Sequence, residues 1–419
     1  MNKRALLIAF HFPPQAASSG IQRTLSFSKH LGGQGWDPMV LSANPIAYAE
    51  KNSSQLANLP QQLIVKRAFA IDAKRHMGIL GRYPECVALP DRWISWWLSA
   101  VPAGLSMIRE HKPAVIWSTF PIASSHLIGL TLHRLSGLPW VADFRDPMMQ
   151  AEYPTTKLQR KAYSWIEKKT IENCQQAVFT TQSALDAYKR RFPEALHAKF
   201  AVIENGYDED GFGTTAPIQS TSAHEKKSSA CVTLLHSGVL YSEGRDPSAF
   251  FDAISLLKKS GAIDAASLQV ILRATGDDPH FHKLVAKFAL EDIVKIAPSV
   301  SYREALQEML SVDGLLVFQG TPFNTQIPAK IYEYFRARKP IFGLLDPAGE
   351  TARVLGAAGF TSLASMKSAD AITPVLENFI EQIKAGKAYV ADEGIIAASS
   401  RQHRAKQLAQ VFNQATGLS

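Results

Sequence analysis

The sequence predicts an α/β protein with two doubly wound Rossmann-like domains that face a cleft. Its 419 residues are enough for two domains, each with a core of its own. Short apolar runs alternate with amphipathic stretches in both halves of the chain, a pattern typical of βαβ units around a parallel sheet. A polar segment at 207–230, rich in Gly, Ser and Thr, separates the two halves.

These patterns divide the chain into four parts. We expect a first domain at 1–206, an interdomain linker at 207–230 and a second domain at 231–395. A last helix at about 396–415 is cationic on one face. We expect the C-terminal segment, 396–419, to pack back on the first domain.

In the first half, the predicted strands are apolar runs suited to a parallel sheet buried on both faces. They fall at 5–10, 39–42, 63–69, 115–119, 140–144, 177–181 and 201–203. The predicted helices carry apolar residues on one side. They fall at 20–31, 97–110, 124–135, 156–173 and 183–191.

The second half starts the alternation again after the linker. Its predicted strands fall at 232–236, 268–274, 294–296, 314–318, 340–345 and 360–363. Its predicted helices fall at 247–260, 279–289, 302–311, 328–338, 348–356 and 369–385. In such folds, ligands bind at the carboxyl ends of the strands.

Charge and composition narrow the class of partner. The net charge of +8 favours anionic ligands or acidic lipid surfaces, but no Lys/Arg run or known motif indicates nucleic acid. Cys86, Cys174 and Cys231 lie far apart, which fits a reducing cytosol. The sequence contains no run of eighteen apolar residues, so it predicts no membrane-spanning helix. The apolar run near the N-terminus is too short for a signal peptide. We therefore expect a cytoplasmic protein.

The segment 326–345 is predicted to form a loop, a helix and a buried strand. Pro328 suits the first turn of that helix, and Lys330 and Glu333 are neighbours on one side of it. A cation beside a helix N-terminus can hold a phosphate group. A carboxylate one turn later can accept hydrogen bonds from sugar hydroxyls. An ordinary surface ion pair would have the same spacing, so the pattern alone leaves both interpretations open.

Two further turns of the second half follow predicted strands. Gly238 and Gly276 allow the backbone to approach a ligand closely, and Arg245 can neutralise a phosphate. The extended backbone before Tyr302 suits the edge of a nucleobase, although any strand-to-helix loop has a similar sequence.

The first predicted strand runs into the turn HFPPQAASSG. Ser18 or Ser19 can cap the next helix, Gly20 permits close backbone approach, and Arg23 lies in the first turn. The turn is not a GxGxxG fingerprint, so we infer no nicotinamide cofactor. A plain strand-to-helix turn would explain the same residues.

Titratable residues also end two strands of the first half. His126 lies near a helix N-terminus, where a neutral imidazole is favoured and could bond a hydroxyl, although a lone histidine is more often structural. Asp143, Arg145 and Asp146 are predicted at one sheet edge. A carboxylate there could orient a hydroxyl or take its proton, or the three charges could simply neutralise one another.

The stretch 91–108, DRWISWWLSAVPAGLSMI, has three tryptophans and a long apolar side. Such a stretch could make a peripheral contact with a membrane interface and reach a lipid-linked molecule. A helix packed in the core of the first domain would have the same composition.

Six segments in order resemble the GT-B fold glycosyltransferases, and more narrowly the family 4-like enzymes of bacterial surface-polysaccharide assembly. They are AFHFPPQAASSGIQR, STFPIASSHLIGL, PWVADFRDP, VIENGYD, HSGVLYSEGRDP and IPAKIYEYFRARKPI. The resemblance implies transfer of a sugar from a nucleotide-sugar donor to the hydroxyl of a carbohydrate or lipid-linked acceptor. It implies a metal-independent reaction that retains anomeric configuration, in the cytoplasm or at the inner face of the cell membrane.

The resemblance also implies roles for particular residues. His126 matches the family histidine that contacts the donor sugar or the reacting centre. Arg245 matches the residue that binds the diphosphate, and Glu333 matches the carboxylate that binds the ribose. Lys330 lies in the matching turn that faces the phosphate. No cofactor and no metal are expected. The candidate site residues are His126, Asp143 and Asp146 for catalysis, Gly238, Arg245, Gly276, Lys330 and Glu333 for the donor, and Gly20 and Arg23 for the acceptor-side loop.

The sequence departs from the family pattern at two places. Thr325 occupies the position of the first of two family glutamates, and no second basic residue precedes Arg245 in its loop. These departures leave open a nucleotide-sugar epimerase of the same fold, or an inactive scaffold for polysaccharide assembly.

Overall fold

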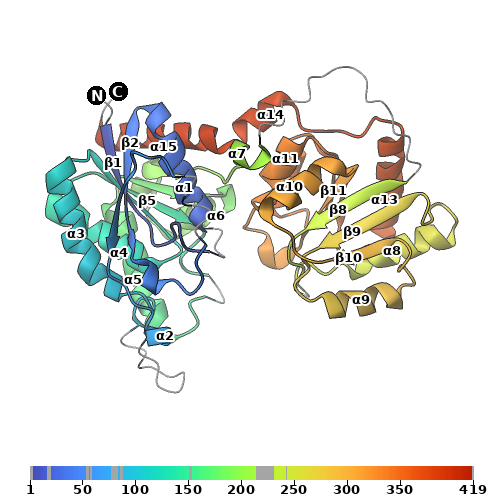
Figure 1. Ribbon diagram of the computed structural model, residues 1–419, viewed down its shortest axis with the longest axis horizontal. Helices are drawn as coiled ribbons and strands as arrows, with labels where there is room; N and C mark the ends of the chain where they lie inside the picture. The colour runs from blue at the N-terminus through green and yellow to red at the C-terminus, as the bar shows by residue number, and fades with distance from the viewer. Residues whose placement is uncertain are drawn as a thin grey trace. The chain divides into compact units, whose positions relative to one another are not determined.

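The chain, described here by a computed structural model, forms two compact units (Figure 1). The first contains Met1–Asn205 and Arg401–Ser419, and the second contains Gly206–Ser400. The structure describes residues 3–16, 20–52, 56, 59–76, 84, 88–150, 153–213, 231–241 and 243–417.

The first unit contains, within its described residues, one parallel seven-stranded sheet in the order β3-β2-β1-β4-β5-β6-β7. Its strands are β1 (Lys3–Ile8), β2 (Trp36–Ala43), β3 (Ile64–Ala68), β4 (Val115–Thr119), β5 (Trp140–Arg145), β6 (Gln176–Phe179) and β7 (Phe200–Val202). Its helices are α1 (Gly20–His30), α2 (Ala73–His76), α3 (Ser95–His111), α4 (Ala123–Ser136), α5 (Lys157–Asn173), α6 (Gln182–Arg191) and α15 (Arg401–Thr416).

The second unit contains, again within its described residues, a parallel six-stranded sheet in the order β10-β9-β8-β11-β12-β13. Its strands are β8 (Val232–Ser237), β9 (Leu268–Arg273), β10 (Val294–Ala297), β11 (Gly314–Gln319), β12 (Ile341–Leu345) and β13 (Leu363–Ser365). Its helices are α7 (Glu209–Phe212), α8 (Ser248–Lys259), α9 (Asp278–Lys287), α10 (Tyr302–Ser311), α11 (Lys330–Ala337), α12 (Glu350–Ala357), α13 (Ala369–Lys384) and α14 (Glu393–Ala398).

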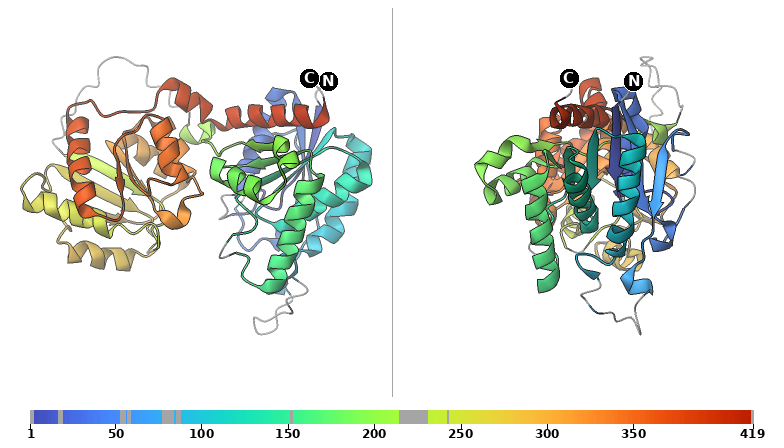
Figure 2. Two further views of the ribbon diagram at one scale, coloured as in Figure 1. Left: turned by 180° about the vertical axis from the view of Figure 1, so that it is seen from behind. Right: turned by 90° about the vertical axis from the view of Figure 1, so that its left-hand side faces the viewer.

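Both strand orders are those of doubly wound folds, so the predicted fold class is confirmed. The order reverses between β1 and β4 in the first sheet and between β8 and β11 in the second. Each sheet has a separate apolar core on each face, because its central strands are buried on both sides. In the first unit, α3, α4 and α5 cover one face, and α1 and α15 cover the other (Figures 1 and 2).

The C-terminal helix packs on the first unit, as the sequence predicts. The ring of Phe412 meets Trp36 edge to face at 5.2 Å, and Trp36 Nε1 donates to Asn413 Oδ1 at 3.1 Å. The single predicted helix at 396–415 is instead two helices, α14 and α15. The helical conformation is interrupted between them, where the carbonyl of Ser399 accepts a hydrogen bond from the N–H of Tyr207.

Other predicted segments differ from the structure in detail. Residues 207–213 of the predicted linker belong to the second unit and include α7, whereas 214–230 lie outside the described residues. Helix α11 begins at Lys330, two residues after Pro328, because Pro328 and Ala329 form a tight turn. Their carbonyls accept hydrogen bonds from the N–H groups of Ile331 and Tyr332. Strand β13 begins at Leu363, where the predicted strand ended.

The tryptophan-rich stretch lies mainly in the first unit's core. Trp96 is fully buried, and Trp97 packs against the core while its Nε1 donates to Thr131 Oγ1 at 3.0 Å. Among the described residues, no helix combines the length and apolar character that crossing a membrane requires.

Replacing Phe412 by Ala should lower the free energy of unfolding by about 3–5 kcal/mol, because the change leaves a cavity against Trp36. Urea denaturation followed by tryptophan fluorescence measures this loss. Gln410→Ala, on the exposed side of the same helix, is the control and should change stability little. Equal stability of Phe412→Ala and wild type would show that α15 is not part of the first unit's core.

Candidate functional site

The loops after β8, β9 and β11 meet the start of α11 at the carboxyl edge of the second sheet. Lys330, the first residue of α11, donates from Nζ to the carbonyl of Ser237 at 2.5 Å. A Cβ atom on Gly238 would lie only 2.7 Å from that Nζ, and Gly238 has a φ of 128°. A glycine is therefore required here, both by the backbone conformation and by the approach of the lysine.

The second cation of this edge, Arg245, is held in a fixed orientation. Its Nε donates to Gln319 Oε1 at 3.1 Å, and its guanidinium stacks over Phe323 at 4.9 Å and Tyr241 at 5.4 Å. Gln319 is in turn fixed by a hydrogen bond from its Nε2 to the carbonyl of Phe323. Neither Nη atom of Arg245 forms a hydrogen bond with a described residue, so the N–H donors of both atoms remain available to a ligand.

The two cations repel each other. Burial, then the charge of Arg245, lowers the pKa of Lys330 to about 7, and Glu333 opposes the shift. Burial, followed by Lys330, lowers the pKa of His236 well below its usual value. Burial also lowers the pKa of Arg245. An anion bound between Lys330 and Arg245 would relieve this repulsion, so the edge is suited to a phosphate group.

The remaining predicted residues of the second unit lie around these cations. Glu333, one turn along α11, accepts a hydrogen bond from the hydroxyl of Tyr302 at 2.8 Å. Gly276 has a φ of 90°, and a Cβ there would lie 2.9 Å from Val239. Gly276 therefore supports the Gly238 loop from behind. The structure thus brings together Gly238, Arg245, Gly276, Lys330 and Glu333.

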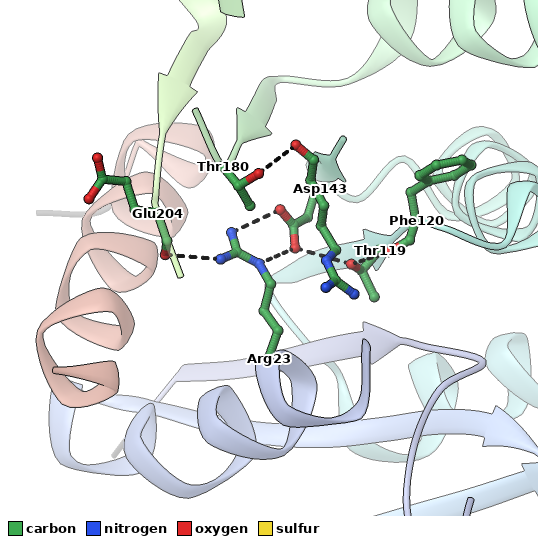
Figure 3. A network of polar contacts seen from close by, with 7 residues as sticks. Arg23, Thr119, Phe120, Asp143, Thr180 and Glu204 are labelled. Carbon is green, nitrogen blue, oxygen red and sulfur yellow. Dashed lines mark hydrogen bonds and ion pairs between the residues drawn. The ribbon is translucent and has the colours of Figure 1, made fainter. Parts of the chain in front are cut away.

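In the first unit, Arg23 and Asp143 form a buried ion pair (Figure 3). Arg23 donates from Nε to Oδ2 at 2.7 Å and from Nη2 to Oδ1 at 3.0 Å, and Thr119 Oγ1 donates to the same Oδ2 at 3.1 Å. The third nitrogen of Arg23 donates to the carbonyl of Glu204 at 3.2 Å. These bonds connect α1 to β4, β5 and the segment after β7, so the side chains of Arg23 and Asp143 both hold elements of the first unit together.

Of the other predicted residues of this edge, Asp146 is partly accessible and Gly20 is buried. Asp146 is half-buried, and burial raises the pKa of its carboxyl although Arg145 and Arg23 oppose the shift. A Cβ on Gly20 would lie 3.0 Å from Arg145 Nη1 and 2.8 Å from His11 Nδ1. The predicted capping residues Ser18 and Ser19 lie outside the described residues.

His126 lies on the opposite face of the sheet from Asp143. Its ring is 4.9 Å from Phe144, and neighbouring residues of a strand point to opposite faces. Its Nδ1 is 2.8 Å from Ser118 Oγ, and burial lowers its pKa to about 3. The imidazole has no exposed surface. The structure therefore does not bring His126 together with Asp143 and Asp146 as one catalytic group.

Some residues of the edge were missed by sequence reasoning. Gln319 was not singled out, although a polar residue that ends an apolar strand is a usable signal. Nothing in the sequence spacing indicates that Tyr241 and Phe323 stack on Arg245. Thr325 is exposed in the loop between η6 (Thr321–Phe323) and α11. The described residues contain no group of three or more His, Cys, Asp or Glu side chains that could hold a metal ion.

Solved structures share this architecture over nearly the whole chain. The sucrose-phosphate synthase of Thermosynechococcus elongatus superposes with a TM-score of 0.65 at 14% identity, covering 98% of each chain. HepE of Anabaena, in complex with UDP and glucose, gives 0.62 at 14% identity over 97% of this chain and 98% of its own. A glycosyltransferase of Rickettsia africae gives 0.63 at 13% identity over the whole of both chains.

The chain has the fold of the GT-B glycosyltransferases. Identities this low show the fold alone. Neither a protein-family model nor a curated protein sequence matches the chain.

Replacing Asp143 by Ala should lower the free energy of unfolding by about 3–5 kcal/mol, because it leaves the buried charge of Arg23 without a partner. Chemical denaturation measures the change. A double variant, Arg23→Met with Asp143→Leu, removes both charges and should recover most of the loss. A double variant as unstable as Asp143→Ala would contradict the role of an uncompensated charge.

Proposed function

We propose that the protein is a glycosyltransferase that moves a sugar from a nucleotide-sugar donor to an acceptor hydroxyl. The observation that carries the proposal is the pair of cations, Lys330 and Arg245, held around Gly238 at the carboxyl edge of the second sheet. Ligands of doubly wound folds bind at this edge. The GT-B fold and the UDP bound in the HepE structure support the proposal, and make a UDP-sugar the first donor to examine.

The chemistry follows from the charges of this edge. Breaking the bond between a sugar and a diphosphate places negative charge on the leaving phosphate. Lys330, Arg245 and the N–H groups at the start of α11 would stabilise that charge. Glu333 would accept hydrogen bonds from the ribose. This arrangement supplies positive charge without a metal, which is why we propose a metal-independent reaction.

For proton transfer at the acceptor we propose Asp146 ahead of the other two catalytic candidates. Asp146 is half-buried with a raised pKa, a setting suited to exchanging a proton. Asp143 and His126 have no exposed surface, so we propose that they act through the structure around the site. Gly20 and Arg23 would shape the acceptor side in the same way.

The finer parts of the proposal come from the resemblance in sequence. They are a hexosyl donor, retention of configuration, a carbohydrate or lipid-linked acceptor, a role in surface-polysaccharide synthesis, and a cytoplasmic location with a peripheral membrane contact. An epimerase of the same fold would release an epimerised nucleotide sugar without any acceptor. An inactive scaffold would bind the nucleotide without turnover, so product analysis separates these alternatives.

Arg245→Ala and Glu333→Ala should each weaken binding of UDP by about 1–3 kcal/mol, the range for losing a charged hydrogen bond. Calorimetric titration of the full chain measures this change. Lys295→Ala, which removes an exposed lysine of β10, is the control and should bind as wild type does. Affinities that are the same in all four proteins would argue against the donor site.

Affinity for UDP should fall as the pH rises above about 7, because the free protein loses the Lys330 proton in that range and a diphosphate favours the protonated form. The decrease should be at most about tenfold per pH unit. Titrations between pH 7 and 9.5 in buffers of different ionisation enthalpy would also show uptake of a proton. In Lys330→Gln this dependence should disappear; if it persists, another group titrates.

A further inference from the structure

A hydrogen bond between two helices orients the carboxylate of Glu333. The hydroxyl of Tyr302, the first residue of α10, donates to Oε1 of Glu333 in α11 at 2.8 Å. Lys330 begins the same helix three residues earlier, but its ammonium group donates to the carbonyl of Ser237 instead. A hydrogen bond to an ionised acceptor is about twice as strong as one between neutral groups. A tyrosine therefore orients the acidic side chain of the candidate donor site.

The tyrosine itself is fixed from two sides. Its backbone begins α10 in a capping box, in which Ser301 Oγ accepts from the N–H of Glu304 at 3.3 Å and Glu304 Oε2 accepts from the N–H of Ser301 at 2.9 Å. Its ring lies against α7, since a Cβ on Gly211 would come within 3.1 Å of Cε1 and 3.5 Å of the hydroxyl oxygen of Tyr302. The glycine therefore leaves the space that the ring of Tyr302 occupies.

The helix that carries Glu333 is held by the same short helix, α7. Arg336 of α11 forms an ion pair with Glu209, and its guanidinium lies over the ring of Phe212 at 5.0 Å. Helices α10 and α11 also pack on one apolar core. Both ends of the hydrogen bond between Tyr302 and Glu333 are thus attached to packed elements, so the carboxylate has a fixed orientation before a ligand binds.

A fixed orientation of this carboxylate matters for binding a ribose. A glutamate side chain has several rotatable bonds, and Glu333 is half-buried. An ionised carboxylate has about four acceptor sites, so it can accept from Tyr302 and from the neighbouring hydroxyls of a ribose at the same time. Ordering a mobile side chain at the moment of binding would weaken the complex. The bond from Tyr302 removes that loss for ligands that carry the hydroxyls.

We propose that Tyr302 is a positioning residue, which holds the Glu333 carboxylate for the vicinal hydroxyls of the donor's ribose. The site then selects ribonucleotides over nucleotides that lack these hydroxyls. The proposal rests on the function proposed above, in which Glu333 binds the ribose, and it adds the residue that makes the carboxylate selective. Tyr302 acts through Glu333 and needs no contact of its own with the nucleotide.

The test compares UDP with 2′,3′-dideoxy-UDP, which lacks both ribose hydroxyls, by calorimetric titration of the full chain. Wild type should bind UDP at least about tenfold more tightly. Tyr302→Phe should weaken UDP binding about three- to tenfold, because the freed carboxylate must be ordered again, and should leave the affinity for the dideoxy nucleotide unchanged. Tyr389→Phe removes the hydroxyl of another exposed tyrosine of the second unit, and this matched control should keep the wild-type selectivity.

The ratio of the two affinities separates positioning from a general effect on stability. A smaller folded fraction weakens the apparent binding of both nucleotides by the same factor, so it leaves the ratio unchanged. Gly211→Ala keeps the tyrosine hydroxyl but displaces the ring, and it should lower the ratio in the same direction. In a Glu333→Ala chain, which has no carboxylate to orient, Tyr302→Phe should have no further effect on the ratio.

An unchanged ratio in Tyr302→Phe would overturn the proposal. An equal loss of affinity for both nucleotides would overturn it as well, because the tyrosine would then contact another part of the ligand. Equal binding of both nucleotides by wild type would show that Glu333 does not hold the ribose, and the proposal would fail with it. A chain that has the expected selectivity but transfers no sugar to any acceptor would refute the proposed glycosyltransferase and leave the role of Tyr302 standing.

Discussion

The contact between Lys330 and the backbone at Gly238 determines the candidate donor site. The ammonium group can reach the carbonyl of Ser237 only because no Cβ occupies the space above Gly238. The same contact places the lysine near Arg245, whose charge adds to burial in lowering the pKa of Lys330. The site therefore has an excess of positive charge, which the negative charge of a diphosphate would balance.

The buried cations of the two units have different kinds of partner, and the proposed function rests on this difference. Arg23 is paired twice with Asp143, and Arg404 in α15 is paired with Glu204, so these charges stabilise the first unit. Among the described residues, Arg245 and Lys330 bond only to neutral groups, Gln319 and the carbonyl of Ser237. Neutral partners orient a cation without satisfying its charge, which is the arrangement expected of a binding site for an anion.

Sequence reasoning predicted the fold well, because buried parallel strands and amphipathic helices leave strong periodic signals. The strands of both sheets were located, and the return of the C-terminal helix to the first unit was expected. Boundaries set by local turns were missed: the tight turn at Pro328 delays α11, and the bond from Tyr207 to Ser399 divides the last helix.

The candidate site was harder to predict, because pairing is decided in three dimensions. Arg23 and Asp143 are 120 residues apart, so the sequence could not show that they bond to each other. His126 was placed at the correct strand end, but the face of the sheet on which its ring lies depends on the packing of Phe144 and Trp140.

Hydrogen–deuterium exchange of the full chain with and without UDP tests the central claim most directly. We expect slower exchange of the amides at 237–246 and 274–277 and at the start of α11, with little change in the helices on the outer faces of the second sheet. Unchanged exchange at these three segments, together with slower exchange elsewhere, would contradict it, because UDP would then bind away from Lys330 and Arg245.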